Sequence, residues 1–167
     1  MDLTQPDLPP RRRLIASLTE YDLAVDALLH SASSDISIFD PDCAQLRLNS
    51  LKRSQSLQRL LHLGGSQRVN IVVHRADHIE RSAPRLLELL RLYPERLSIR
   101  VTSCEARHAQ DCFVIADAAD CVRRPVAAQP RGVCIENDVQ EVSLQRERFA
   151  QLLAATDTIV QAASLGL

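Results

Sequence analysis

The segment at residues 68–74, Arg-Val-Asn-Ile-Val-Val-His, restricts the fold more than any other part of the chain. It is rich in β-branched residues and follows Gly64-Gly65, so it predicts a strand that begins after a turn. Its apolar run, Ile71-Val72-Val73, does not alternate with polar residues, which indicates burial on both faces, as in a central parallel strand. A parallel strand needs helical crossovers and helices over both faces of its sheet. The segment therefore predicts an α/β domain.

The rest of the chain alternates helical and strand patterns, as this class of fold requires. Helical spacing begins at Ser17, where Thr19 can cap the helix. The apolar residues at this spacing are Leu23, Ala24, Ala27 and Leu28. Further helices are predicted at residues 50–62, 79–93 and 139–155, and further strands at 35–40, 97–102, 111–116, 121–126 and 132–136. The order predicts a mostly parallel mixed sheet flanked by helices, with an antiparallel hairpin extension.

The chain has 167 residues and is expected to form one α/β domain, which we place at residues 17–156. Prolines among the first ten residues disfavour regular structure, so residues 1–16 are predicted to be a flexible N-terminal arm. Residues 157–167 are predicted to be a C-terminal tail. Within the domain, Pro84 is expected either to bend the helix around it or to mark its first turn.

Charge and cysteine content narrow the class of partner and the compartment. Twenty basic and 21 acidic groups give a net charge of −1, which removes the main electrostatic attraction to nucleic acid or to an anionic membrane. The five cysteines include no C-x-x-C pair, which is typical of a reducing compartment. The sequence has neither a secretory signal nor an apolar window long enough to span a membrane. We therefore expect a cytoplasmic protein with no membrane association.

Polar residues follow the predicted parallel strands, where ligands bind in open α/β sheets. Asp40 and Asp42 follow one strand, and His74 and Arg75 follow the next. These four residues are the predicted ligand-binding site, although strand ends are also polar wherever loops are simply solvated.

Histidine and cysteine residues spaced by four raise the question of a metal site. The two pairs are His74 with His78 and Cys104 with His108. Such a pair binds a metal ion when both residues lie on one helix face, but His74 is predicted to end a strand. The sequence also contains no G-x-S-x-G motif, and no glycine-rich loop follows a strand. We expect neither a metal nor a cofactor.

Three segments carry a resemblance to a known superfamily: Ile38–Asp42, Val72–His74 and Asp111–Asp117. Together with the order of the elements, they are similar to one half of a phospholipase D-like domain. The closest resemblance is to an uncharacterised bacterial group of degenerate half-domains, some of which are fused to acetyltransferase-type domains. The resemblance implies an α/β half-domain and a site on the strand that opens the hairpin.

Active members of this superfamily carry H-x-K followed by four residues and an Asp. The resemblance implies that the His is the nucleophile, the Lys holds phosphate oxygens and the Asp orients the His. In this chain the matching positions hold Gln110, Cys112 and Asp117, so only the Asp is kept. The superfamily's later G-S-x-N element is not kept after Gly132. His108 lies two residues before Gln110, which places it on the same face of a strand.

We therefore predict a non-catalytic module that acts in binding, regulation or assembly. The alternative is a phosphodiesterase-type enzyme that uses His108 and Asp117 as catalytic residues across a dimer. A second alternative is an anion or nucleotide sensor, whose arginines would be Arg75, Arg107, Arg123 and Arg124. The enzyme requires His108 and Asp117 to face one pocket, the sensor requires several arginines to line one, and the module requires neither.

The resemblance also implies a partner, because a complete phospholipase D-like site needs two halves. Superfamily members with a single half are similar to homodimers in which the hairpin lies near the two-fold axis. We expect a homodimer or a protein partner such as an acetyltransferase-type protein. The apolar hairpin residues 112–116 agree with an interface, but an intramolecular helix would bury them equally well.

Overall fold

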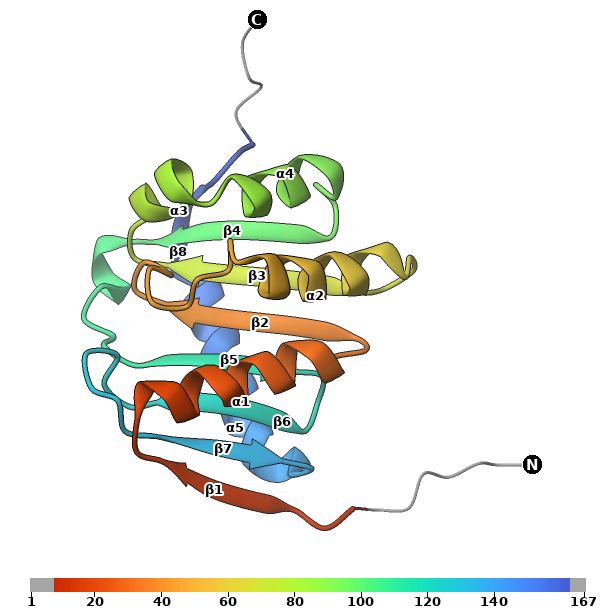
Figure 1. Ribbon diagram of the computed structural model, residues 1–167. Coiled ribbons are helices and arrows are strands. Elements are labelled where there is room, and N and C mark those ends of the chain that lie inside the picture. Colours follow the sequence, from red (N-terminus) through yellow and green to blue (C-terminus); the bar gives the residue numbers. More distant parts are fainter. Residues whose placement is uncertain (1–7, 163–167) are drawn as a thin grey trace, which may run out of the picture.

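The computed structural model describes residues 8–162, and these form the predicted α/β fold (Figure 1). The elements in chain order are β1 (Arg11–Ile15), α1 (Leu18–Ser31), β2 (Asp35–Asp40), α2 (Leu51–His62), β3 (Arg68–Val73), α3 (Asp77–Ser82), α4 (Pro84–Leu92), β4 (Leu97–Thr102), a 3₁₀ turn (Cys104–Ala106), β5 (Cys112–Ala116), β6 (Asp120–Arg124), β7 (Gly132–Glu136), α5 (Val139–Ala154) and β8 (Thr156–Ile159). The strands form one eight-stranded sheet in the order β1-β7-β6-β5-β2-β3-β4-β8.

Strand β3 lies inside the sheet, as its sequence predicts. It pairs in parallel with β2 on one side and with β4 on the other. Ile71 and Val72 have no exposed surface, and they belong to the apolar cores on opposite faces of the sheet. The unbroken apolar run is therefore explained by helices on both faces.

The parallel part of the sheet is smaller than predicted. Only β2–β3 and β3–β4 are parallel among the described strands, and the other neighbouring strands are antiparallel. The connections from β5 to β6 and from β6 to β7 are too short for a crossover helix, so these strands must return antiparallel. The sheet is mixed rather than mostly parallel.

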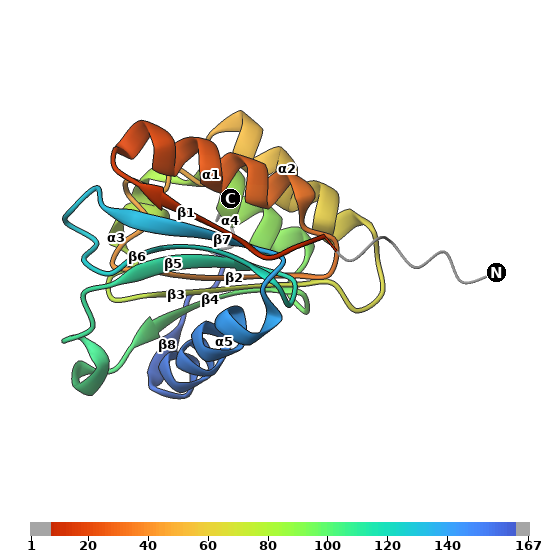
Figure 2. The ribbon, with the colours of Figure 1, turned by 90° about the horizontal axis from the view of Figure 1, so that it is seen from below.

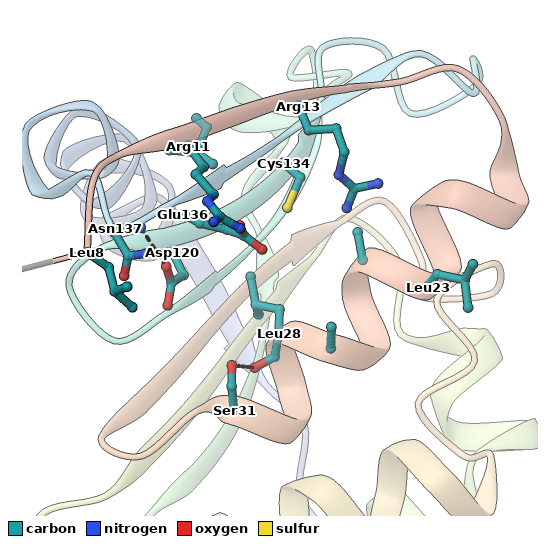
Figure 3. A pocket seen from close by; sticks show the side chains of 13 residues that line it. Leu8, Arg11, Arg13, Leu23, Leu28, Ser31, Asp120, Cys134, Glu136 and Asn137 are labelled. Atoms are coloured by element: carbon teal, nitrogen blue, oxygen red, sulfur yellow. Dashed lines mark hydrogen bonds between the residues drawn. The ribbon is translucent and has the colours of Figure 1, made fainter. Parts of the chain in front are cut away.

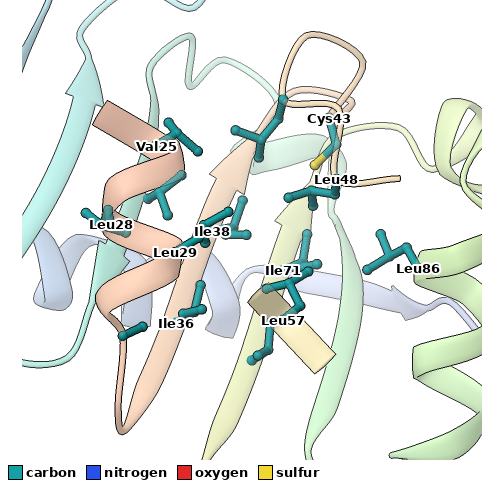
Figure 4. Close-up of a cluster of buried hydrophobic side chains, with 14 of the residues drawn as sticks. Val25, Leu28, Leu29, Ile36, Ile38, Cys43, Leu48, Leu57, Ile71 and Leu86 are labelled. Carbon is teal, nitrogen blue, oxygen red and sulfur yellow. The ribbon is translucent and has the colours of Figure 1, made fainter. Parts of the chain in front are cut away.

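Helices cover both faces of the sheet (Figures 1 and 2). Helices α1 to α4 lie over one face, where Val25 and Leu29 of α1 meet Ile36 and Ile38 of β2 (Figure 4). Helix α5 covers the other face and packs on a second core that includes Phe113. Within residues 8–162, no helix has the length and apolar character needed to cross a membrane.

Helix α1 differs from its predicted form in its cap and its buried face. Ser17 caps the helix, not Thr19, because its hydroxyl accepts a hydrogen bond from the backbone N–H of Glu20 at 3.1 Å. Leu23 and Ala27 are exposed, against expectation. The buried face is rotated because it must meet β5 and β6, and it consists of Tyr21, Ala24, Val25, Leu28 and Leu29.

The helix predicted at residues 79–93 is divided into α3 and α4. Pro84 is the first residue of α4. A backbone N–H at this position makes no intrahelical hydrogen bond, so its absence in proline does not weaken the helix. Ala83 between the two helices has φ −124° and ψ 57°, so the backbone turns there. Pro84 therefore starts a second helix rather than bending one.

Both edge strands lie in segments that were predicted to be irregular. Residues 11–15 form β1 instead of the end of a flexible arm, and residues 156–159 form β8 at the start of the predicted tail. Each gains backbone hydrogen bonds by pairing with a strand distant in sequence, β1 with β7 and β8 with β4. The remainder of the predicted arm and tail, at residues 1–7 and 163–167, lies outside the described residues.

Candidate functional site

Most of the predicted site residues gather at one edge of the sheet, which we call the carboxyl edge. The parallel strands β2, β3 and β4 end there. Strand β5 starts at the same edge, because it pairs antiparallel with β2 and places Phe113 beside Phe39. Strand β6 ends there, with Arg124 beside Cys112. The segments that follow β2, β3 and β4 therefore all begin at the carboxyl edge.

Asp117 lies at the opposite edge of the sheet. Its backbone N–H donates to the carbonyl of Asp35 at the start of β2, at 2.9 Å. Its carboxylate accepts hydrogen bonds from the backbone N–H groups of Ser33, Ser34 and Asp35, the shortest 2.7 Å from Ser34. Its φ of 56° is left-handed, which Asp tolerates better than most residues. Asp117 thus secures a turn, and it does not share a pocket with His108.

His108 is exposed in the loop before β5. Its Nδ1 lies 2.6 Å from the carbonyl oxygen of Glu105, and because a carbonyl only accepts, Nδ1 carries the hydrogen. The ring lines a cleft of about 530 Å³ at the carboxyl edge. Gln110, at the superfamily's nucleophile position, lines the same cleft. His108 therefore faces a cavity, but without the carboxylate that was predicted to orient it.

Cys112, at the superfamily's Lys position, is completely buried. Its sulfur lies 3.9 Å from the hydroxyl of Tyr21 on α1. Burial raises the pKa of the Cys112 thiol to about 11, so the side chain is a neutral thiol near pH 7. It can supply neither a positive charge nor a thiolate to the cleft.

Arg124 is a buried cation beside Cys112, with 2% of its surface exposed. Its guanidinium stacks over the ring of Tyr21 at 4.3 Å. It donates to the carbonyl of Gln129 at 3.2 Å and to the side chain of Gln45 at 3.3 Å. Sequence spacing does not predict Tyr21 or Gln45 as neighbours of Arg124, because both lie in distant segments of the chain. Arg124 is directed into the protein and packs under α1.

Asp40 is also buried, with 5% of its surface exposed. Its Oδ1 accepts hydrogen bonds from the backbone N–H groups of Cys43 at 2.7 Å and Asp42 at 3.2 Å. Burial raises the pKa of the Asp40 carboxyl above its ordinary value, against the opposing effect of these hydrogen bonds. The carboxylate shapes the turn after β2, where Cys43 has a left-handed φ of 61°. Asp40 is therefore better explained as a turn-forming residue than as a ligand.

His74 is buried between three elements. Its Nε2 lies 2.6 Å from the carbonyl oxygen of Ala109, and its Nδ1 lies 2.7 Å from the hydroxyl of Thr102. Nε2 donates to the carbonyl, so in the neutral ring Nδ1 accepts from the hydroxyl. The ring also meets Phe39 edge-on, with the ring centroids 5.3 Å apart. His74 fastens the loop before β5 to β3 and β4, and neither ring nitrogen is left for a ligand.

Asp42 and Arg75 line a separate cavity of about 330 Å³, together with Asp77, His78 and Arg81. Arg75 Nη2 lies 3.5 Å from a carboxylate oxygen of Asp42, and both side chains are partly exposed. The four predicted ligand-binding residues are therefore divided. Asp40 and His74 are structural, whereas Asp42 and Arg75 face solvent. Within residues 8–162, no three His, Cys, Asp or Glu side chains come together as a metal site would require.

The cleft that His108 lines is rich in hydrogen-bond donors from β6 and α5. Arg148 forms a bidentate ion pair with Asp111, with N···O distances of 2.7 and 2.6 Å. Arg123 makes only long contacts, 3.4 Å each, to Gln145 and Glu141. The Nε of Arg123 is buried and has no hydrogen-bond partner among the described residues. The cleft therefore contains an arginine whose donors are incompletely used.

The comparisons with known sequences give a family but no function. The family model described as "Domain of unknown function (DUF7931)" matches residues 17–161. No curated protein matches the chain.

Solved structures give the fold. TrmBL2, an archaeal chromatin protein described as showing a novel mode of DNA binding, aligns with a TM-score of 0.65 at 13% identity, over 93% of this chain and 56% of TrmBL2. Nuc, a phospholipase D family member from Salmonella typhimurium, aligns with a TM-score of 0.64 at 13% identity, over 92% of this chain and 99% of Nuc. Phosphatidylserine synthase from Haemophilus influenzae aligns with a TM-score of 0.59 at 16% identity, over 98% of this chain and 43% of the synthase.

These alignments show a phospholipase D-like fold and, at such identities, the fold alone. The chain spans about the whole of Nuc, but it spans only 56% of TrmBL2 and 43% of the synthase.

Proposed function

The chain belongs to the DUF7931 family of domains of unknown function, and we propose that it is a non-catalytic phospholipase D-like module that acts by binding. The environment of Cys112 carries this proposal. At the position where the superfamily resemblance places a phosphate-binding Lys, the chain has a neutral thiol that Tyr21 covers. A phosphodiester at the cleft would meet Gln110 in place of the superfamily's nucleophilic His, and no Lys at the position of Cys112.

The enzyme alternative, with His108 and Asp117 acting across a dimer, has less support. The carboxylate of Asp117 already accepts hydrogen bonds from successive backbone N–H groups. Turning it toward a histidine of another subunit would break these hydrogen bonds and remove the side-chain acceptor that holds the backbone of residues 33–35 in place. Asp117 could therefore orient a histidine only by giving up the hydrogen bonds that stabilise this turn.

A phosphodiesterase assay tests the proposal. We expect wild-type protein and the His108→Ala variant to hydrolyse bis(p-nitrophenyl) phosphate at the same background rate, because the general acid–base and nucleophilic contributions of several decades in rate are missing. An active phosphodiesterase in the same buffer serves as the positive control. Turnover by the wild type that disappears in His108→Ala would reject the non-catalytic module and favour the enzyme.

A second candidate function is anion sensing, and the unpartnered Nε of Arg123 favours it. Among the arginines predicted for a sensor, Arg123 and Arg124 are at the cleft and Arg75 lines the other cavity. The guanidinium of Arg124 is buried against Tyr21, so Arg123 is the arginine of this pair that is available to an anion. Guanidinium donors bind carboxylate and phosphate oxygens in pairs. The near-neutral net charge of −1 favours a small anion over a nucleic acid.

Isothermal titration with inorganic phosphate tests this second candidate. We expect binding by the wild type, loss of binding in Arg123→Ala, and unchanged binding in Arg81→Ala, which removes an exposed arginine outside the cleft. Equal binding by all three proteins, or no binding at all, would reject the sensor and leave the non-catalytic module untouched.

We also propose a homodimer, as the resemblance implies. Its support is weaker than the sequence indicates, because β5 and β6 lie inside the sheet and are covered by α1 and α5. The apolar hairpin residues are thus buried within one chain. Light scattering decides the question: a species of 18.6 kDa would reject the dimer, and twice that mass would support it.

A further inference from the structure

Strand β1 has an unpaired outer edge. Among the described strands it pairs only with β7, in the register that places Arg11 opposite Glu136 and Ile15 opposite Gly132. Its outward backbone N–H and C=O groups therefore have no strand partner in the described part of the chain. Such an edge is a template for another extended segment.

The side chains of β1 give this edge a strongly basic character. Arg11, Arg12 and Arg13 are consecutive. Arg12 points toward α5 and forms an ion pair with Glu141 at 3.1 Å. Arg11 and Arg13 point to the opposite face of the sheet, and no ion pair of either is found within residues 8–162.

A groove of about 440 Å³ lies between β1 and α1. Figure 3 shows Arg11 and Arg13 extending into it from the strand, and Leu23 and Leu28 facing it from the helix. Leu23 is 63% exposed, and Leu14, on the other face of β1, is 77% exposed. Glu136 and Asp120 also line the groove, and Glu136 lies opposite Arg11 on β7, but neither forms an ion pair with Arg11 or Arg13 among the described residues. The edge thus combines two arginines without an ion pair with exposed apolar side chains.

We propose that the outer edge of β1 binds an acidic, extended segment of a partner protein, which adds to the sheet as a further strand. The register of an antiparallel strand gives its pattern. The residues opposite Arg11 and Arg13 lie on the groove side and are acidic, and the residue opposite Leu14 is apolar. Read from its amino end, the segment is apolar, acidic, polar, acidic. Backbone hydrogen bonds supply affinity, and these side chains supply specificity.

A second copy of β1 does not fit this edge. In the antiparallel pairing of two β1 strands over their full length, Arg13 lies opposite Arg13 of the other copy, and like charges directly opposite are destabilising. Charged edge residues also protect sheets from unwanted pairing. Three arginines repel a basic strand, and an apolar strand would desolvate them without compensation. An acidic strand is attracted by the same side chains.

A fluorescence anisotropy titration tests the proposal with a labelled, end-capped peptide, Gly-Ser-Val-Glu-Thr-Glu-Ser-Gly. We expect binding by the wild type, and binding weaker by about tenfold or more in Arg11→Glu/Arg13→Glu. The same peptide with Lys in place of both Glu residues should bind this variant better than it binds the wild type. The matched control is Arg81→Glu/Arg107→Glu, which makes the same change in charge at exposed positions outside β1.

Hydrogen exchange distinguishes strand addition from simple ionic contact. The peptide should slow exchange of backbone amides within residues 11–15. Absence of binding, equal binding by both double variants, or binding without this protection would each overturn the proposal. The interaction uses no residue of the cleft at the carboxyl edge, so its failure leaves the non-catalytic assignment unaffected.

Discussion

The hydroxyl oxygen of Tyr21 lies 3.9 Å from the sulfur of Cys112, which joins helix α1 to strand β5. The guanidinium of Arg124 stacks over the same ring at 4.3 Å. Burial raises the pKa of the Tyr21 hydroxyl well above its ordinary value, so the phenol stays neutral at all physiological pH values. Tyr21, Cys112 and Arg124 pack together at the position where the superfamily resemblance puts a phosphate-binding cation. This position is therefore buried in the protein interior.

Alkaline pH should expose the effect of the buried thiols on stability. Burial raises the pKa of Cys112 to about 11, whereas an unfolded thiol ionises near pH 8.5, so between about pH 8.5 and 11 the unfolded state loses a proton that the folded state keeps. The stabilisation is complete below the unfolded pKa and is lost as pH rises toward the folded value. Urea unfolding should therefore show a free energy of unfolding that falls by up to about 1.4 kcal/mol per pH unit for this thiol.

The Cys112→Ala variant is the control for that titration. It lacks the thiol, so its stability should fall less steeply over the same pH range than that of the wild type. Identical slopes for the two proteins would show that Cys112 does not ionise differently in the folded and unfolded states.

Asp117 should matter for stability and not for catalysis. Asp117→Ala removes the acceptor of the Ser34 N–H and places Ala at a φ of 56°. We expect a loss of about 1–3 kcal/mol in the free energy of unfolding. Asp117→Asn keeps one acceptor oxygen and tolerates the left-handed backbone, so its loss should be smaller. Equal stability of the wild type and Asp117→Ala would contradict the turn-securing role.

The elements with strong local patterns could be predicted from the sequence, and the edge strands could not. The apolar run of β3 carries its own signal of burial on both faces. By contrast, the Arg-Arg-Arg-Leu-Ile sequence of β1 does not alternate, and prolines precede it. Its strand conformation depends on pairing with β7, which lies more than a hundred residues away. No local window contains that information.

The candidate site was predictable in position but not in the roles of its residues. The topology rule correctly placed His74 at the carboxyl edge. Its ring contacts Thr102 and the carbonyl of Ala109, which lie far from it in the sequence. The residue that is predicted to bind a ligand is therefore buried and connects β3 to other segments by hydrogen bonds. Asp117 matched a motif position, but its place in a tight turn decides its role. Spacing predicts which residues share an edge, and only tertiary packing decides which of them face solvent.

Substitution at the centre of the sheet tests the assignment of the core. Val72 has no exposed surface and lies on β3 between β2 and β4. Val72→Asp would bury an unpaired carboxylate at a cost of several kcal/mol. This cost is a large part of the free energy of unfolding of a whole domain, which is about 5–15 kcal/mol. Arg68→Asp on the same strand is exposed and should have little effect. Cooperative urea unfolding of Val72→Asp at the wild-type midpoint would contradict a central position for β3.

Restoring the superfamily's motif tests whether the site has been closed or only altered. Cys112→Lys would place an ammonium group in a fully buried position close to the Arg124 guanidinium. We expect a loss of several kcal/mol in the free energy of unfolding, because neither desolvation nor a neighbouring cation favours a second charge there. Cys112→Ala controls for the loss of the thiol and should unfold at a higher urea concentration than Cys112→Lys.

The double variant Gln110→His/Cys112→Lys extends this test to chemistry. Both superfamily residues are then present, but Tyr21 of α1 still covers position 112. We expect no hydrolysis of bis(p-nitrophenyl) phosphate above background, because the side chain at position 112 points toward Tyr21 of α1 and does not line the cleft. Adding Tyr21→Ala to the double variant removes the cover and serves as the matched comparison. Hydrolysis by the double variant itself would mean that the site is open and that only two side chains separate this domain from an active one.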